Sequence, residues 1–258
     1  MPGDVKQYWV VVLDLENSSS RTDPILESLN TAMHDIVGEA RKRAGLPEDG
    51  IAVEDRGDGV LMILPASVPA IDLVGGFIRA LDDELAQRAA VYSAAHAMRF
   101  RVAAHLGFAS WNGTSWTGGA VNDTCALVEA GPLRGVLTAA TSARMVFAVS
   151  DQIYQSLVRH GHRSIDPATY LPMPFRTKHG ETVRGWVTVP GYPAPPGLTG
   201  EEQQPPASGP APGASGTTGP PPAPAAGSVT NIVTGTVHGD LVQGHKIGTV
   251  NLNRPGQP

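Results

Sequence analysis

The sequence has little of several features that would point to common classes of protein. Cys125 is its single cysteine, so no disulfide can form within the chain, and a reducing cytoplasm is the expected compartment. Apolar runs stay well short of 18 residues, so we expect no membrane-spanning helix. Basic residues are not in excess, since 19 Lys and Arg stand against 24 Asp and Glu, which argues against nucleic acid as a partner. No GxSxG sequence is present, which argues against a hydrolase with a nucleophile elbow.

Proline and glycine, by contrast, are frequent and unevenly distributed. Residues 191–227 are roughly half Pro or Gly, a composition that buries too little apolar surface to offset the entropy of ordering. We interpret this segment as a disordered linker; the alternative, a Pro-rich ligand for an adaptor domain, lacks flanking basic anchors. The predicted organisation is therefore a domain at 1–190, the linker at 191–227, a β motif at 228–253 and a disordered end at 254–258.

The first 190 residues show the pattern of an α+β domain. The apolar, β-branched run that starts the chain predicts a buried strand rather than a signal peptide. The expected elements are a strand at 8–15, a helix from 23 to about 45, a hairpin of 51–55 with 60–64, a helix at 70–90, a strand at 100–107 paired with 108–111, a helix at 122–129, a strand at 145–149, a helix at 150–159 and a hairpin around 179–180. The order β-α-β-β-α-β predicts a ferredoxin-like antiparallel sheet with helices on one face.

Two carboxylates of this domain are expected to converge. Asp14 ends the first strand and Asp58 lies in the tight turn of the following hairpin, which the topology places beside that strand. A close pair of carboxylates binds Mg²⁺ or Mn²⁺, because hard cations need oxygen ligands and offset the repulsion between the charges. Glycines around Asp58 leave room for a phosphate to approach. The alternative is a plain surface turn, with Asp14 only ending a strand.

The domain resembles the class III nucleotide cyclase homology domain over about residues 6–190. The segments that carry the resemblance are VVVLDLEN with Asp14, VEDRGDGVLMIL with Asp58, RFRVAAHLGFASWNG from Arg99 and TGGAVNDTCAL around Asn122. The resemblance implies that Asp14 and Asp58 hold the metal pair that activates the ribose 3′-hydroxyl and stabilises the triphosphate. It further implies that Glu54 reads a purine, as in guanylate-type sites, and that Asn122 orients the ribose. A head-to-tail homodimer is implied as well, since the metal and purine ligands come from one subunit and the Asn-Arg pair from the other.

The sequence also departs from this family. Ala126 stands where the family has an arginine that stabilises charge developing on the phosphates, and the loss of such a group reduces the rate by orders of magnitude. Ser115 occupies the second purine-reading position in place of Asp or Cys. The Phe-containing turn after the first Asp is replaced by Glu16-Asn17-Ser18-Ser19. The sequence therefore predicts an intact metal half and an eroded half in trans.

Two other candidate sites have simpler interpretations. His160 and His162 could be metal ligands, but beside Arg159 and Arg163 they are more typical of a solvated helix end. Cys125 has no evident His partner and is expected to be a small buried side chain.

The C-terminal motif at 228–253 has a different character. It is rich in Val, Ile and Thr, and Gly-Thr-Val occurs at 235–237 and again at 248–250, so two β arms are predicted. Such arms bury no core alone, but copies stacked in register do. The motif resembles the bacterial RHIM-related amyloid signalling motif, which implies recruitment by a receptor or adaptor that carries a matching motif. The alternatives are a disordered end or an edge strand docked on the domain. The matching residues include Asn231, Val233, Gly235, Val237, Gly239, Val242, Gln243, Gly244, Ile247, Gly248 and Val250.

Three functional hypotheses follow from these features. The first is a bacterial signalling protein in which a degenerate cyclase-like domain is recruited through a self-templating motif. The second is a working guanylate-type cyclase that converts GTP to cyclic GMP with two divalent metals. The third is a nucleotide sensor that binds a triphosphate without turnover. The sequence leaves open whether a heterodimer partner supplies the missing arginine.

Overall fold

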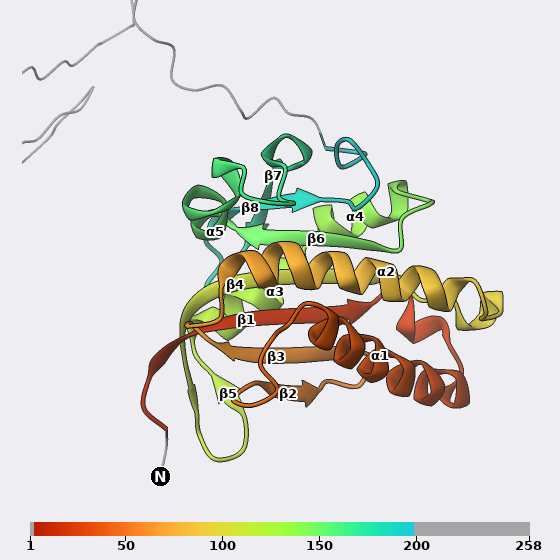
Figure 1. Cartoon of the computed structure of the whole chain (residues 1–258), viewed down its shortest axis with the longest axis horizontal. Coiled ribbons are helices and arrows are strands. Elements are labelled where there is room, and N and C mark those ends of the chain that lie inside the picture. The colour runs from red at the N-terminus through yellow and green to blue at the C-terminus, as the bar shows by residue number, and fades with distance from the viewer. Residues whose placement is uncertain (1–2, 199–258) are drawn as a thin grey trace, which may run out of the picture. The chain divides into compact units, whose positions relative to one another are not determined.

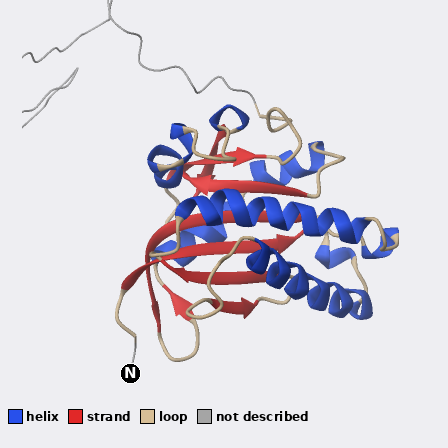
Figure 2. Ribbon diagram, in the orientation of Figure 1, coloured by secondary structure: helices blue, strands red, loops and turns tan. Residues whose placement is uncertain are grey.

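A computed structural model describes residues 3–198. The predicted C-terminal motif at 228–253, with its candidate residues, and the predicted linker after residue 198 lie outside this range. The elements at the start of the domain are β1 (Lys6–Leu15), α1 (Asp23–Arg43), β2 (Ala52–Asp55), β3 (Gly59–Pro65), a π-helical turn η2 (Asp72–Phe77), α2 (Ile78–Ala89) and β4 (Phe100–Trp111). They are followed by β5 (Trp116–Thr117), α3 (Gly119–Val128), α4 (Gly131–Ala139), β6 (Met145–Ser150), α5 (Asp151–Ser156), β7 (Leu171–Arg176) and β8 (Thr182–Thr188). Figure 1 labels these elements and Figure 2 shows helices and strands by colour.

One sheet organises the described residues. Its strand order is β2-β3-β1-β4-β6-β8-β7, and β5 pairs with the end of β4. The central strand β1 lies antiparallel between β3 and β4, as the β-α-β-β-α-β order predicts. The pairing of β4 with β6 is parallel, so the sheet is mixed rather than wholly antiparallel. The predicted α+β fold is confirmed.

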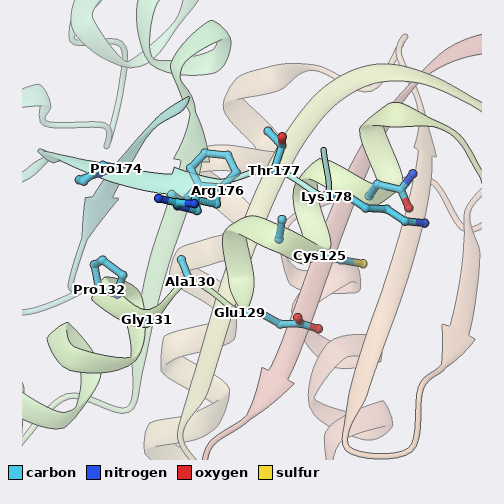
Figure 3. A pocket seen from close by; sticks show the side chains of 12 residues that line it. Cys125, Glu129, Ala130, Gly131, Pro132, Pro174, Arg176, Thr177 and Lys178 are labelled. Atoms are coloured by element: carbon cyan, nitrogen blue, oxygen red, sulfur yellow. The ribbon is translucent and has the colours of Figure 1, made fainter. Parts of the chain in front are cut away.

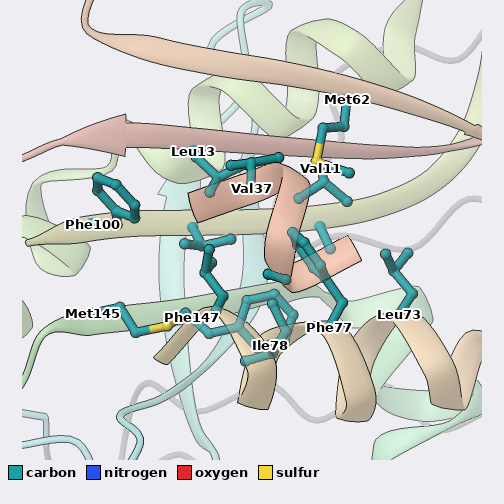
Figure 4. Packing of buried hydrophobic residues seen from close by; sticks show 14 of the residues in the cluster. Val11, Leu13, Val37, Met62, Leu73, Phe77, Ile78, Phe100, Met145 and Phe147 are labelled. Atoms are coloured by element: carbon teal, nitrogen blue, oxygen red, sulfur yellow. The ribbon is translucent and has the colours of Figure 1, made fainter. Parts of the chain in front are cut away.

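Helices cover both faces of the sheet, whereas the sequence analysis predicted helices on one face only. Alternate residues of β1 point to opposite sides, so Val11 and Leu13 join one buried cluster and Val10 and Val12 join another. The first cluster lies under α1 and α2, and Figure 4 shows Phe77 of η2 directed toward the strands. The second cluster lies under α3 and α4. The short α4, which follows α3 almost directly, was missing from the prediction, and it covers the second face.

A second difference concerns β4. The predicted pair of strands, 100–107 with 108–111, is one continuous strand, and the hairpin partner of its end is Trp116–Thr117. Gly107, the last residue of the first predicted strand, lies inside this continuous strand and packs against α3. A Cβ added there would lie 2.9 Å from the Cβ of Ala120, so the glycine permits α3 to start close to the strand. No helix within residues 3–198 has the length and apolarity needed to cross a membrane.

Candidate functional site

The two predicted metal ligands lie side by side at one end of β1. Asp14 pairs with Gly59 across the β1–β3 ladder, and the amide of Leu15 donates to the carbonyl of Asp58 at 2.9 Å. A Cβ on Gly59 would lie 2.5 Å from the carbonyl oxygen of Leu13, so only glycine fits this close approach. The charge of Asp58 raises the pKa of Asp14, which places the two carboxylates within electrostatic reach of each other. The topology therefore brings both side chains to one edge, as the sequence analysis expected.

Arg101 lies against Asp14 and was not among the predicted site residues. The two residues are paired across β1 and β4, and the guanidinium of Arg101 donates to the carboxylate of Asp14. Their side chains are only 11% and 19% exposed, so the ion pair is largely shielded from water. Burial raises the pKa of Asp14, while the charge and the hydrogen bond of Arg101 lower it. A charged residue in the otherwise apolar strand 100–104 was the sequence signal for this contact.

The turn after β1 contacts the second carboxylate. Asn17 has a left-handed backbone with φ of 57°, and the short 3₁₀ turn Ser18–Ser20 follows it. The hydroxyl of Ser18 donates to Oδ2 of Asp58 at 2.5 Å. Both Ser18 and Asp58 line a cavity of about 440 Å³ together with Asn30 of α1. This turn, which replaces the Phe-containing turn of the family, therefore holds Asp58 at the mouth of a cavity.

Glu54, the predicted purine-reading residue, lies on β2 close to the same turn. Its Oε2 accepts from Arg56 at 2.9 Å, whereas its Oε1 is buried without a hydrogen-bond partner. A buried carboxylate oxygen that lacks a donor is costly, because the ionised group has lost water without a replacement. Oε1 of Glu54 therefore has no hydrogen-bond donor within the described residues, and Glu54 lines none of the described cavities.

The chemistry of this edge suits a hard divalent cation. Asp14 and Asp58 offer oxygen ligands, and a cation between them would relieve the repulsion that raises the pKa of Asp14. Residues 3–198 contain no group of three or more His, Cys, Asp and Glu side chains that could hold a metal. The coordination would therefore have to be completed by backbone oxygens, water or a phosphate.

The remaining predicted residues lie elsewhere in the domain. Ser115 is in the β4–β5 turn, where its amide donates to Oδ1 of Asn112 at 2.9 Å. Asn122 is one turn into α3 and lines two cavities, of about 590 and 470 Å³. Ala126, one turn later, is partly buried against the apolar cluster under α3. These residues form what we call the Asn half, and Asp14, Asp58, Glu54 and Arg101 form the Asp half.

The described cavities do not combine the two halves. Asp14 is level with Arg101 on β4, and α3 starts level with Gly107 and Phe108, since a Cβ on Gly118 would lie 2.7 Å from the carbonyl of Phe108. The start of α3 is therefore six residues, or about 20 Å, along the strand from the level of Asp14. The cavities that Asn122 lines include no residue of the Asp half, and the cavity at Asp58 includes none of the Asn half.

His105 and Ser150 make a further polar contact in the cavity that the first residue of α3 also lines. Nδ1 of His105 and Oγ of Ser150 are 2.8 Å apart, and both residues line the 470 Å³ cavity. Burial lowers the pKa of His105, so the ring is neutral near pH 7, although the charge of Asp123 acts in the opposite direction. The contact joins β4 to the end of β6.

The other two candidates carry no site chemistry. His160 and His162 are both exposed, in agreement with a solvated helix end. Cys125 is partly buried, and burial raises the pKa of its thiol, which disfavours the reactive thiolate.

Comparisons with known proteins relate this fold to nucleotide cyclases. No known protein family and no curated protein matches the sequence. Among solved structures, an adenylate/guanylate cyclase/hydrolase from Silicibacter pomeroyi has a TM-score of 0.52 and 16% sequence identity, over 73% of this chain and 99% of that chain. A bacterial light-regulated adenylyl cyclase has a TM-score of 0.51 and 14% identity, over 74% of this chain and 53% of that chain. The described residues therefore have the fold of adenylate/guanylate cyclases.

Proposed function

We propose that the domain binds a nucleoside triphosphate between two copies of itself and turns it over slowly or not at all. In this homodimer the Asp half of one subunit faces the Asn half of the other. The proposal is supported by the cavities at Asn122 and at Asp58, none of which is lined by residues of both halves. It is also supported by Phe108, a residue 64% exposed beside the start of α3, which a second copy would cover.

The Asp half carries the nucleotide-binding part of the proposal. Asp14 and Asp58 would hold Mg²⁺ or Mn²⁺, and the metal would neutralise charge on the phosphates. Arg101, which is buried in an ion pair with Asp14, would keep that carboxylate in position beside the metal. The unpartnered Oε1 of Glu54 would accept from the N–H groups on the pairing edge of guanine, so GTP is favoured over ATP.

The Asn half carries the prediction of weak turnover. Ala126 has no charge and its methyl group packs on an apolar cluster, so α3 provides no cation for charge that develops on a transferring phosphate. Loss of one such group costs a factor of about 10²–10³ in rate.

A binding assay combined with product analysis tests this function. We expect the full chain with Mn²⁺ to bind a fluorescent GTP analogue and to form no more cyclic GMP than Asp58→Asn. Asp58→Asn should weaken binding at least tenfold, or about 1.4 kcal/mol. The matched control is Asp49→Asn, which removes an exposed carboxylate shortly before β2 and should leave binding unchanged. Absence of binding would refute the proposal, and a strict preference for ATP would contradict the role of Glu54.

The second candidate is the active guanylate-type cyclase. It is favoured by the adjacent positions of Asp14 and Asp58 across the β1–β3 pairing. Robust formation of cyclic GMP that Asp58→Asn abolishes would establish this function in place of the first.

For the C-terminal part we propose recruitment in the cytoplasm through a self-templating motif at 228–253, carried by the linker at 191–227. This proposal rests on the sequence, because the motif lies outside the described residues. Stacked copies would pair their backbones and interdigitate Val and Ile, with an amide ladder at Gln243. A receptor or adaptor with a matching motif would seed the stack.

A peptide of residues 228–253 tests the motif directly. We expect fibrils with a cross-β diffraction pattern, and we expect Gln243→Asp to suppress them, because like charges would repeat about 4.8 Å apart along the stack. Gln243→Asn, which keeps the amide, is the matched control. Fibrils that form equally well from Gln243→Asp, or a parent peptide that stays monomeric, would remove the support for templating.

A further inference from the structure

One cavity of the described residues lies between α3, the start of α4 and the β7–β8 hairpin. We call it the hairpin pocket, and its volume is about 590 Å³, which is within the range of small-molecule sites. Figure 3 shows Arg176 across the pocket from Ala130 and Pro132, and Lys178 at the end where Cys125 lies. Asn122 and Ala126 of the Asn half also line it.

The charges of the hairpin pocket favour an anion. It is lined by two cations, Arg176 and Lys178, and by one acid, Glu129. Both cations are exposed, and none of the ion pairs found within residues 3–198 includes them. Their charges are therefore available to a ligand.

The adjacent cavity behind α3 has the opposite balance. Asp123, Asp151 and Glu181 face a single arginine, Arg184, and His105 is neutral because burial lowers its pKa. An anion that enters this side of the domain is therefore directed to the hairpin pocket rather than to its neighbour.

Uncharged groups of the hairpin pocket also suit an anion. Oγ1 of Thr177 is buried without a hydrogen-bond partner, and a phosphate oxygen would accept from it. The backbone of Thr177 is fixed by two hydrogen bonds of 2.9 Å, one from its amide to Glu181 and one to its carbonyl from Gly180. The backbone of the hairpin is therefore held in place at Thr177, which lines both the hairpin pocket and the neighbouring cavity.

We propose that the hairpin pocket binds the phosphate chain of the nucleotide and that Arg176 supplies the guanidinium that α3 lacks at Ala126. This inference rests on the proposed function, since the nucleotide would be held by the Asp half of the other subunit. Arg176 of β7 lines the same pocket as Asn122 and Ala126, so this pocket contains a guanidinium although the helix offers only a methyl group at Ala126. A guanidinium binds two phosphate oxygens at once, which suits a polyphosphate.

Calorimetric titration of the full chain with inorganic tripolyphosphate and with a non-hydrolysable GTP analogue tests the proposal. Arg176→Ala should weaken tripolyphosphate binding about tenfold or more, because hydrogen bonds to charged groups are involved. Arg184→Ala is the matched control, since Arg184 is an exposed arginine of the same hairpin that lines the neighbouring cavity. It should change the affinity less than about twofold, because Arg184 does not line the hairpin pocket and salt screens the charges of exposed side chains. Arg176→Lys should fall between the parent and Arg176→Ala.

The outcomes separate this inference from the proposed function. Equal losses in Arg176→Ala and Arg184→Ala would overturn the pocket proposal, and so would GTP-analogue binding that Arg176→Ala leaves unchanged. In both cases nucleotide binding by the parent chain would preserve the proposed function. Tripolyphosphate binding that depends on Arg176 without any binding of the GTP analogue would support an anion site and refute the nucleotide function. No binding of either compound would refute both. Thermal melting confirms that each variant is folded.

Discussion

The ionisation of Asp14 depends on residues that are distant in the sequence. Burial and the charge of Asp58 raise its pKa, and the guanidinium of Arg101 acts against both. The charge of Arg134 acts in the same direction as that of Arg101, but the pKa of Asp14 remains above its usual value. Two uncompensated carboxylates at this edge would repel each other, so Arg101 stabilises the edge before any ligand binds.

Replacement of Arg101 by Met tests this balance. We expect the free energy of unfolding to fall by about 3 kcal/mol at pH 7.5, because removal of one partner leaves a buried charge unpaired. Without Arg101 the pKa of Asp14 in the folded variant rises further. The carboxyl group of Asp14 is then protonated and uncharged at low pH. The variant loses stability when this group has to ionise, which happens as the pH rises through its pKa. The loss measured by urea unfolding should therefore be smaller at pH 4.5 than at pH 7.5. If the free energy of unfolding fell equally at both pH values, the charge of Arg101 would not matter, and its side chain would stabilise the fold through packing alone.

Strands and helices with a clear periodicity were predictable from the sequence. The helix that begins at Asp23-Pro24 and the hairpin around Asp58 occur where the apolar spacing and the turn residues placed them. The position of Asp14 beside Asp58 followed from topology alone, because a β-α-β-β order puts the first strand next to the hairpin.

Features that depend on contacts between elements were not predictable. A glycine within an apolar strand indicates either a turn or a close approach, and only the position of Ala120 shows that Gly107 is the second case. Arg101 faces Asp14 through the register of β1 and β4, which the sequence does not specify. That Arg176 lines a cavity with Asn122 and Ala126 depends on how α3 packs against the β7–β8 hairpin, and these elements are far apart in the sequence. The covering of both sheet faces likewise required the three-dimensional structure.

At the scale of the whole molecule, the proposed function places one nucleotide site between two copies of the chain. The Asp half and the Asn half each carry incomplete chemistry, and Asp58 and Asn122 line different cavities of one subunit. A two-fold axis would place each half against the other and make two equivalent sites per dimer. Mutations in different halves should therefore complement each other when subunits are mixed.

The most direct measurement is the number of GTP-analogue sites in an equal mixture of Asp58→Asn and Asn122→Ala chains, unfolded and refolded together. Each variant alone should bind little, because both sites of its homodimer carry a defect. In the mixture half of the dimers are heterodimers with one intact site, so about a quarter of the parent capacity should return. Variants refolded separately and then combined under conditions without subunit exchange are the control. If the mixture binds no more than the separate variants, the site is not shared between subunits and the account is contradicted.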